Sequence, residues 1–168
     1  MGGTKTTTST VTLTRTVTTQ ASPGQGALAQ TQNARYFGTP VSVTQVDAKR
    51  YLLVLKPQFF LVGVAANVAF AASQGTQCAP LTCPAVEDDR WVIPAGTQNL
   101  TFVLPATTKG TVLTLSHQQM HTTTVTGMEL AAIVGGATTP HLMEPLDSGL
   151  WLTIDGDKVT SFAQQFQP

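Results

Sequence analysis

The stretch WLTIDGDKVT, residues 151–160, decides the fold class of this chain. Its centre is an Asp-Gly pair, Asp155-Gly156, which lies between two short runs of apolar and β-branched residues. Tight two-residue hairpin turns need positive φ angles, which Asp and Gly adopt easily, so this pair predicts a hairpin between two strands. The C-terminal part of the chain is therefore predicted to be an antiparallel pair.

Further runs upstream of this hairpin have the β-branched content and the alternation that are typical of strands. They lie at residues 41–46, 51–55, 59–70, 91–93, 99–104, 111–115 and 121–126. The apolar run 59–72 is predicted to be a core strand, and Met128–Val134 is predicted to be a further strand, although it is the only run where a short helix would also fit. About eight short strands spaced about 8–12 residues apart are typical of a sandwich or jelly roll. We therefore predict an all-β protein with a single β-sandwich, jelly-roll-like domain over residues 39–168.

The N-terminal segment has a different pattern. Every even-numbered residue from Thr4 to Thr18 is threonine, and three of the odd positions between them are Val11, Leu13 and Val17. Alternate side chains of an extended strand point to opposite faces, so this segment has a hydroxyl face and a face with an apolar strip. Residues 1–20 are predicted to be an extended arm that reaches a neighbouring molecule, or else an unstructured threonine-rich tail. Residues 21–38, rich in Gln, Gly and Ala, are predicted to be a linker.

The composition indicates a protein that works inside an assembly. Charged residues make up 11% of the chain, against about 25% in ordinary soluble domains. Threonine (29 residues) and glutamine (14 residues) take their place, and the net charge is zero. Neutral hydroxyl and amide surfaces suit interfaces where buried charges would be costly. Nucleic acid is not an expected partner, because phosphate binding needs clustered Lys and Arg.

Neither the N-terminus nor the longest apolar run predicts a membrane-bound or secreted protein. The N-terminus has no apolar core of a signal peptide, and the run 59–72 is too short and too interrupted to span a bilayer. We therefore expect synthesis in a cytoplasm and no membrane partner. Because disulfides are rare in that compartment, Cys78 and Cys83, separated by four residues, are predicted to be free thiols, although a small-loop disulfide is the alternative.

Catalytic residues are not evident in the sequence. His117 and His121, with His141 and Glu144, are the only candidates for a metal site of the kind that a cupin-like jelly roll would hold. The simpler interpretation places these histidines in loops. No nucleophile elbow and no phosphate-binding glycine loop is present. We therefore expect no enzymatic activity and no cofactor.

Two tryptophans and one acidic run complete the candidate set. Trp91 and Trp151 are predicted to be core or interface anchors, with a sugar-stacking platform as the sharper alternative. The run Glu87-Asp88-Asp89 is predicted to be a solvated loop, with cation binding or pairing to a neighbour as the alternative.

One part of the chain resembles a known protein family. The segment AANVAF (residues 65–70), followed by a variable loop and by WVIPAGTQNLTFV (residues 91–103), is similar to small β-sandwich virion proteins of tailed bacteriophages. The resemblance covers roughly residues 50–115, and it implies a head decoration (cement) protein located on the virion. It also implies as partners the major capsid protein or other virion subunits, and a homo-oligomer, with a trimer favoured.

In such a protein the arm would add a strand to an exposed sheet edge of a neighbouring subunit. The predicted partner contacts are Trp91, Trp151 and the arm residues Thr4, Thr6, Thr8, Thr10, Val11, Thr12, Leu13, Thr14, Thr16 and Val17. Two other functions stay open at this point. The first is a fibre or carbohydrate-binding module on the surface of a virion or cell, and the second is a cupin-like metalloenzyme.

Overall fold

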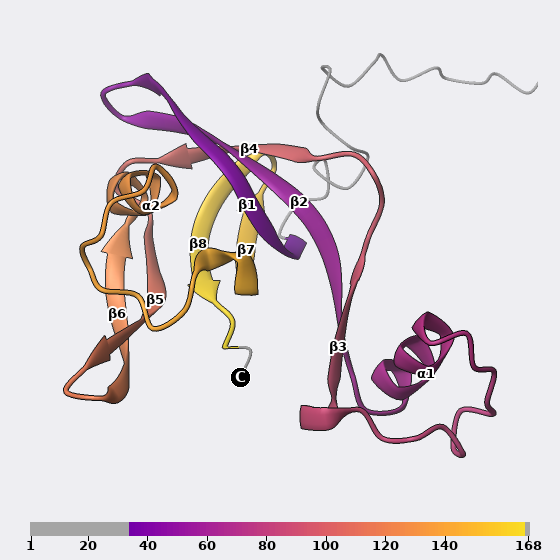
Figure 1. Cartoon of the computed structure of the whole chain (residues 1–168). Coiled ribbons are helices and arrows are strands. Elements are labelled where there is room, and N and C mark those ends of the chain that lie inside the picture. The colour runs from indigo at the N-terminus through magenta and orange to yellow at the C-terminus, as the bar shows by residue number, and fades with distance from the viewer. Residues whose placement is uncertain (1–33, 167–168) are drawn as a thin grey trace, which may run out of the picture.

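The computed structural model describes residues 34–166 (Figure 1). Eight strands, two α-helices and two short 3₁₀ helices make up this part of the chain. In chain order they are β1 (Ala34–Asp47), β2 (Arg50–Val62), α1 (Gly63–Ser73), η2 (Glu87–Asp89), β3 (Arg90–Pro94), β4 (Leu100–Pro105), β5 (Lys109–Ser116), β6 (Gln119–Thr126), α2 (Gly127–Val134), η3 (Leu146–Ser148), β7 (Leu150–Asp155) and β8 (Lys158–Gln164).

Five of the strands close into a barrel. The pairs follow the ring β1-β2-β4-β8-β7 and return from β7 to β1. Only the pair β4–β8 in this ring is parallel, at Val103 and Lys158. The all-β class is therefore confirmed, but the strands form a closed barrel where the sequence predicted two stacked sheets. Five-stranded Greek-key barrels of the OB type have a similar architecture, and a barrel of this kind assigns no function by itself.

The length and curvature of β1 explain why the sheet closes. Residues 34–38 of β1 pair with β7, and residues 37–47 pair with β2, with register shifts after Pro40 and after Gln45. Such shifts bend a strand and increase its twist. Gly38 lies at the crossover, where a Cβ atom would stand 2.2 Å from the carbonyl oxygen of Lys56. A side chain at position 38 would therefore push β1 and β2 apart.

The strand boundaries sharpen the domain prediction. Because β1 begins at Ala34, the last five residues of the predicted linker 21–38 belong to the barrel. The predicted arm, residues 1–20, lies outside the described residues. The hairpin predicted at Asp155-Gly156 is confirmed, because β7 and β8 pair in antiparallel fashion up to Asp155 and Lys158, with Gly156 and Asp157 in the turn. Gly156 has the positive φ angle, 63°, that this turn requires.

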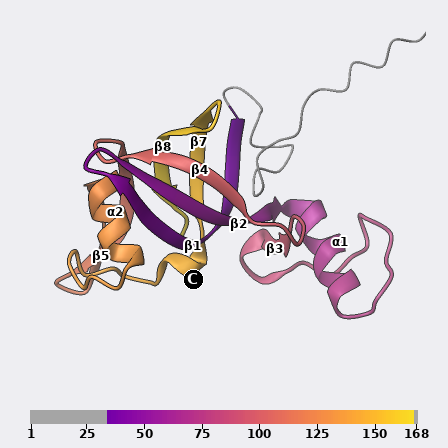
Figure 2. The same cartoon turned by 90° about the horizontal axis from the view of Figure 1, so that it is seen from above.

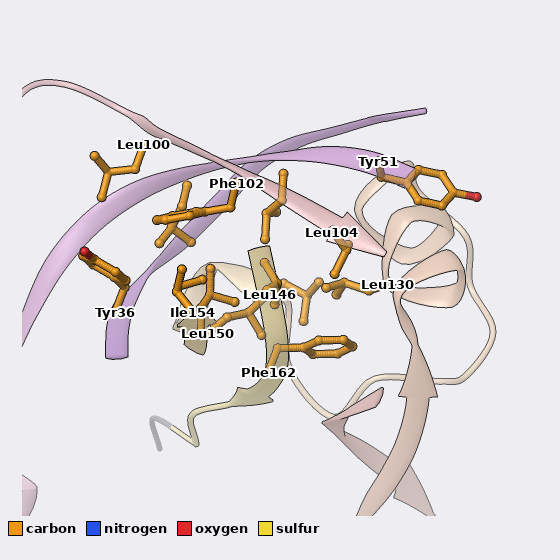
Figure 3. Close-up of a cluster of buried hydrophobic side chains, with 14 of the residues drawn as sticks. Tyr36, Tyr51, Leu100, Phe102, Leu104, Leu130, Leu146, Leu150, Ile154 and Phe162 are labelled. Carbon is orange, nitrogen blue, oxygen red and sulfur yellow. The ribbon is translucent and has the colours of Figure 1, made fainter. Parts of the chain in front are cut away.

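The barrel encloses one apolar core (Figure 3). Its members come from every barrel strand, from β5, β6, α2 and η3, and most have no solvent exposure. The fully buried side chains are Leu53, Leu55, Leu104, Val112, Leu130, Leu150, Leu152, Ile154 and Val159. At about 25 cal/mol per Å² of buried apolar surface, a core of this kind is the main favourable contribution to folding.

Helix α2 packs on the barrel and begins with a capping box. The Thr126 hydroxyl accepts a hydrogen bond from the Glu129 backbone N–H, while the Glu129 carboxylate accepts one from the Thr126 backbone N–H. The backbone N–H of Thr126, followed by its hydroxyl, lowers the pKa of Glu129 below the usual 4.5. Leu130 and Ile133 face the barrel core from this helix. The strand prediction for Met128–Val134 is therefore wrong, and the alternative of a short helix holds there.

Candidate partner-binding surface

A lobe, defined here as residues 58–94, projects from the barrel (Figures 1 and 2). It comprises the end of β2, α1, a loop with η2, and β3. The pairing of β2 with β1 ends at Gln58, and from Gln58 to Val62 β2 pairs with β3. The principal contacts of α1 are with β2, β3 and η2. One long strand thus carries the lobe away from the barrel.

The sequence prediction of a core strand over residues 59–72 is wrong in its second half. The strand ends at Val62, and Gly63–Ser73 forms α1. Gly63 has a φ angle of 59°, which breaks the extended conformation. Five of the next nine residues, 64–72, are alanine, the residue with the highest helix propensity, so the local preference here is helical.

The interior of the lobe is thin. The rings of Phe70 and Trp91 meet edge to face with centroids 4.9 Å apart, which joins α1 to β3. The Val86 backbone N–H donates a 2.8 Å hydrogen bond to Asn67 Oδ1, which ties the loop to the helix. Only small side chains in the lobe are fully covered, namely Ala66, Ala71 and Val86. Little apolar surface is therefore buried within the lobe itself.

A disulfide between Cys78 and Cys83 closes the loop after α1. The prediction of two free thiols is therefore wrong. The cause is a local turn, in which the backbone N–H and the hydroxyl of Thr82 both donate to the Ala79 carbonyl oxygen. This turn brings the two Cα atoms to 5.2 Å, within the usual range for a disulfide. Local geometry thus decided the pairing, whereas the prediction rested on the expected compartment.

The outside of the lobe presents large apolar side chains to solvent. Phe59 is 52% exposed, Val62 59%, Val64 44% and Leu81 89%. Scattered exposed apolar residues are ordinary on protein surfaces, and four of them on one small projection make it a candidate for an interaction site. None of the four belongs to the predicted site residues. The signal for three of them was the apolar run 59–72, which the sequence analysis assigned to a core strand, while Leu81 lies outside that run.

A groove of about 410 Å³ lies on the lobe between apolar and charged side chains. Phe70, Trp91 and Val92 are among its apolar lining residues, and Glu87, Asp88 and Arg90 are its charged ones. Asp88 and Asp89 have φ angles of 61° and 54°, which are uncommon for residues other than glycine. The Arg90 guanidinium lies 3.8 Å from Asp88 Oδ2 and donates to the Phe166 carbonyl oxygen at 3.1 Å.

An aromatic cluster holds the lobe to the barrel. Phe60 of the lobe packs against Phe37 of β1 at 5.1 Å and against Trp151 of β7 at 5.9 Å between ring centroids. The Arg35 guanidinium stacks over Trp151 at 4.4 Å. Gly149 leaves room for this cluster, because a Cβ at that position would stand 2.3 Å from the Phe37 ring. The three rings fix the direction in which the lobe projects.

The predicted site residues fall into different places. Trp91 lies inside the lobe and Trp151 lies in the aromatic cluster, and both are half-buried. The Trp151 indole N–H donates to Gln165 Oε1 at 3.0 Å. The two tryptophans therefore serve as packing anchors in separate ring clusters and do not form one exposed stacking platform. The predicted arm contacts, Thr4–Val17, lie outside the described residues.

The histidines do not converge on a metal site. His117 occupies the β5–β6 turn with a φ angle of 50°, and its Nδ1 is 3.0 Å from Ser116 Oγ. His121 lies on β6. His141 lies in the loop between α2 and η3, where its carbonyl oxygen accepts a hydrogen bond from the Leu115 backbone N–H. Over residues 34–166, no group of three or more His, Cys, Asp or Glu side chains is arranged to hold a metal ion.

The carboxyl groups with a shifted pKa have structural roles. Glu129 caps α2, and Asp47 lies at the end of β1, where a hydrogen bond from the Arg50 side chain lowers its pKa below the usual value. Both lie outside the lobe.

Comparison with known proteins adds no relative: no family model, curated protein or solved structure matches the chain. Neither of the helices over residues 34–166 is long and apolar enough to cross a membrane.

Proposed function

We propose that this chain is a structural subunit of a larger assembly, specifically a decoration (cement) protein on a virion shell. Its partners are then the major capsid protein or other virion subunits, and its action is attachment without chemistry. The exposed apolar surface of the lobe carries the proposal. The side chains of this surface are exposed to water in a free monomer, which costs free energy, and a bound partner would bury them.

Three further observations support an attachment role. The barrel supplies a rigid base, and the aromatic cluster of Phe37, Phe60 and Trp151 fixes the lobe on it. The disulfide restrains the loop that presents Leu81. A chain with so few charged residues can bury much of its surface without desolvating ions. The sequence resemblance to small virion proteins supplies the specific setting.

The proposal is tested by locating the protein in a lysate of the cells that produce it. Particles are sedimented, the chain is detected with an antibody, and the particles are imaged with antibody-labelled gold. A decoration protein is expected in the particle fraction, in fixed proportion to the major shell subunit, with label on the outer surface. Recovery of the chain only in the supernatant would contradict the proposal.

The contribution of the lobe is tested by substitution in the full chain. The triple variant Phe59→Ser, Val62→Ser and Leu81→Ser removes three of the exposed apolar side chains and is expected to abolish particle binding. A matched control replaces three exposed apolar residues of the barrel, Val41, Val46 and Leu52, by serine. The control is expected to bind normally. Equal binding by both variants would exclude the lobe as the contact surface.

A further inference from the structure

The outer edge of β6 is an open template for another strand. All eight residues of β6, Gln119–Thr126, pair with β5 in one unbroken register. Among residues 34–166, β6 has no strand on its other side, so it ends the sheet. Strands at a sheet edge carry a row of unpaired backbone N–H and C=O groups that can pair with an added strand.

The protective devices that usually blunt such an edge are missing from β6. Natural edge strands are commonly protected by Lys, by Pro, by a bulge or by being very short. The β6 sequence, QMHTTTVT, contains no charged residue, no Pro and no Gly, and its register has no bulge. The other end of the sheet, β3, has five residues, begins with Arg90 and ends with Pro94. An added strand would therefore find β6 the better template.

The two faces of the β5–β6 hairpin differ in chemistry. On one face Leu115 of β5 lies opposite Met120 of β6, and these side chains are 40% and 51% exposed. On the other face the Thr114 and Thr123 hydroxyl oxygens lie 2.7 Å apart, in hydrogen-bond contact. Along β6 the face of Met120 also carries Thr122 and Thr124, whereas the opposite face carries Val125, which is 3% exposed. An incoming strand that matches this edge therefore needs hydroxyls on the face of Met120 and apolar side chains on the face of Val125.

The N-terminal segment of this chain has that pattern. Threonine occupies every even position from 4 to 18, and Val11, Leu13 and Val17 occupy odd positions. Cross-strand pairs of threonine hydroxyls, and of apolar side chains, each stabilise neighbouring strands. We propose that residues 4–18 of one copy add to the β6 edge of a neighbouring copy, with the threonine face beside Thr122 and Thr124 and the apolar strip on the face of Val125. This proposal rests on the proposed function in one respect, because it assumes that copies of the chain are neighbours in an assembly.

The experiment measures amide hydrogen exchange of the full chain at residue resolution, at two protein concentrations. Light scattering gives the molar mass under the same conditions. The arm variant Leu13→Pro/Thr14→Pro removes a backbone donor on each edge of the arm. Its matched control, Ala27→Pro/Ala29→Pro, places two prolines between the arm and β1.

In the wild type, all β6 amides are expected to be protected at high concentration, together with a mass above that of the monomer. In the arm variant, every second β6 amide before Thr126 is expected to exchange about tenfold faster or more, because edge amides open to solvent. The variant is expected to be monomeric, and the control to behave like the wild type. Met120→Lys is expected to weaken association, whereas Val46→Lys, at an exposed position on β1, is expected to leave it unchanged.

Two results would overturn the proposal. The first is an alternating exchange pattern in the β6 amides of the wild type that the arm prolines do not change. The second is protection of every β6 amide in a monomer at all concentrations, which would place the arm on its own chain. Neither result depends on the lobe, so the failure of this proposal is distinguishable from failure of particle binding.

Discussion

The barrel and the lobe use apolar residues in opposite ways. In the barrel, side chains as large as Phe102 and Leu53 are at most 1% exposed, and they come from strands far apart in sequence. In the lobe, the covered residues are two alanines and one valine, while Phe59 and Leu81 face solvent. The barrel thus buries its own apolar surface, and the lobe leaves much of its apolar surface available.

This difference indicates a division of labour within one chain. Fold stability arises mainly from buried apolar area, so the barrel can hold its structure without a partner. A projection with a thin interior needs other restraints, and here these are the disulfide, the Phe70–Trp91 contact and the aromatic cluster. We therefore expect substitutions in the barrel to change folding, and substitutions in the lobe to change binding.

The largest contrast is expected between two phenylalanines. Phe102→Ala removes a ring from the centre of the barrel and is expected to lower the free energy of unfolding by about 3–5 kcal/mol. Phe70→Ala removes a half-buried ring of the lobe and is expected to cost less than about 2 kcal/mol. Urea denaturation followed by circular dichroism measures both. Equal losses would show that the lobe and the barrel form one cooperative core.

The next effect concerns a buried glutamine of β8 that forms hydrogen bonds with β5 and with the loop before η3. Gln164 Oε1 accepts from the Leu113 backbone N–H at 2.9 Å, and its Nε2 donates to the carbonyl oxygens of Glu144 and Pro145. Gln164→Leu removes these hydrogen bonds and is expected to cost about 1–3 kcal/mol in unfolding free energy. Gln165→Leu, at a half-buried position, is the control and is expected to cost less.

A smaller effect is expected at the cap of α2. Thr126→Ala removes the N-cap hydroxyl and is expected to cost about 1 kcal/mol. Folding lowers the pKa of Glu129, so the unfolded chain binds more protons near pH 4.5, and stability rises with pH there. The wild type should therefore be more stable than Glu129→Gln above about pH 4.5. That advantage is expected to shrink as the pH falls further, measured by thermal unfolding from pH 7 to pH 3.

The smallest effect on the barrel is expected from loss of the disulfide. In the chain-entropy model a disulfide that closes a loop of six residues stabilises the folded state by about 2 kcal/mol. This stabilisation keeps the loop of the lobe ordered. The variant Cys78→Ser/Cys83→Ser is expected to change unfolding of the barrel by less than about 0.5 kcal/mol. Amide exchange near residues 76–86 is expected to accelerate. A loss of several kcal/mol in barrel stability would contradict the separation of the two regions.

Local sequence patterns predicted the strands and hairpin well, because they depend on neighbouring residues. The hairpin at Asp155-Gly156 is an example, whereas Met128–Val134, predicted as a strand, belongs to helix α2. Closure of the barrel could not be predicted, since it depends on the parallel contact of Val103 with Lys158 and on the bends in β1. The disulfide depends on a turn at Ala79–Thr82, which the sequence analysis did not consider. Helix α1 depends on the alanine content of residues 64–72, which was interpreted only as part of an apolar run typical of a strand. The exposed apolar surface of the lobe could not be predicted from the sequence, because the same apolar residues indicate a core when their neighbours in space are unknown.

The most direct test of the central claim is side-chain footprinting of the chain, free and on the particle. Hydroxyl radicals label exposed side chains, and mass spectrometry measures the labelling of each residue. If the lobe is the attachment surface, Phe59, Val62 and Leu81 lose most of their labelling on the particle, while Val46 and Leu52 of the barrel keep theirs. Unchanged labelling of the lobe, with protection confined to the barrel, would contradict the account.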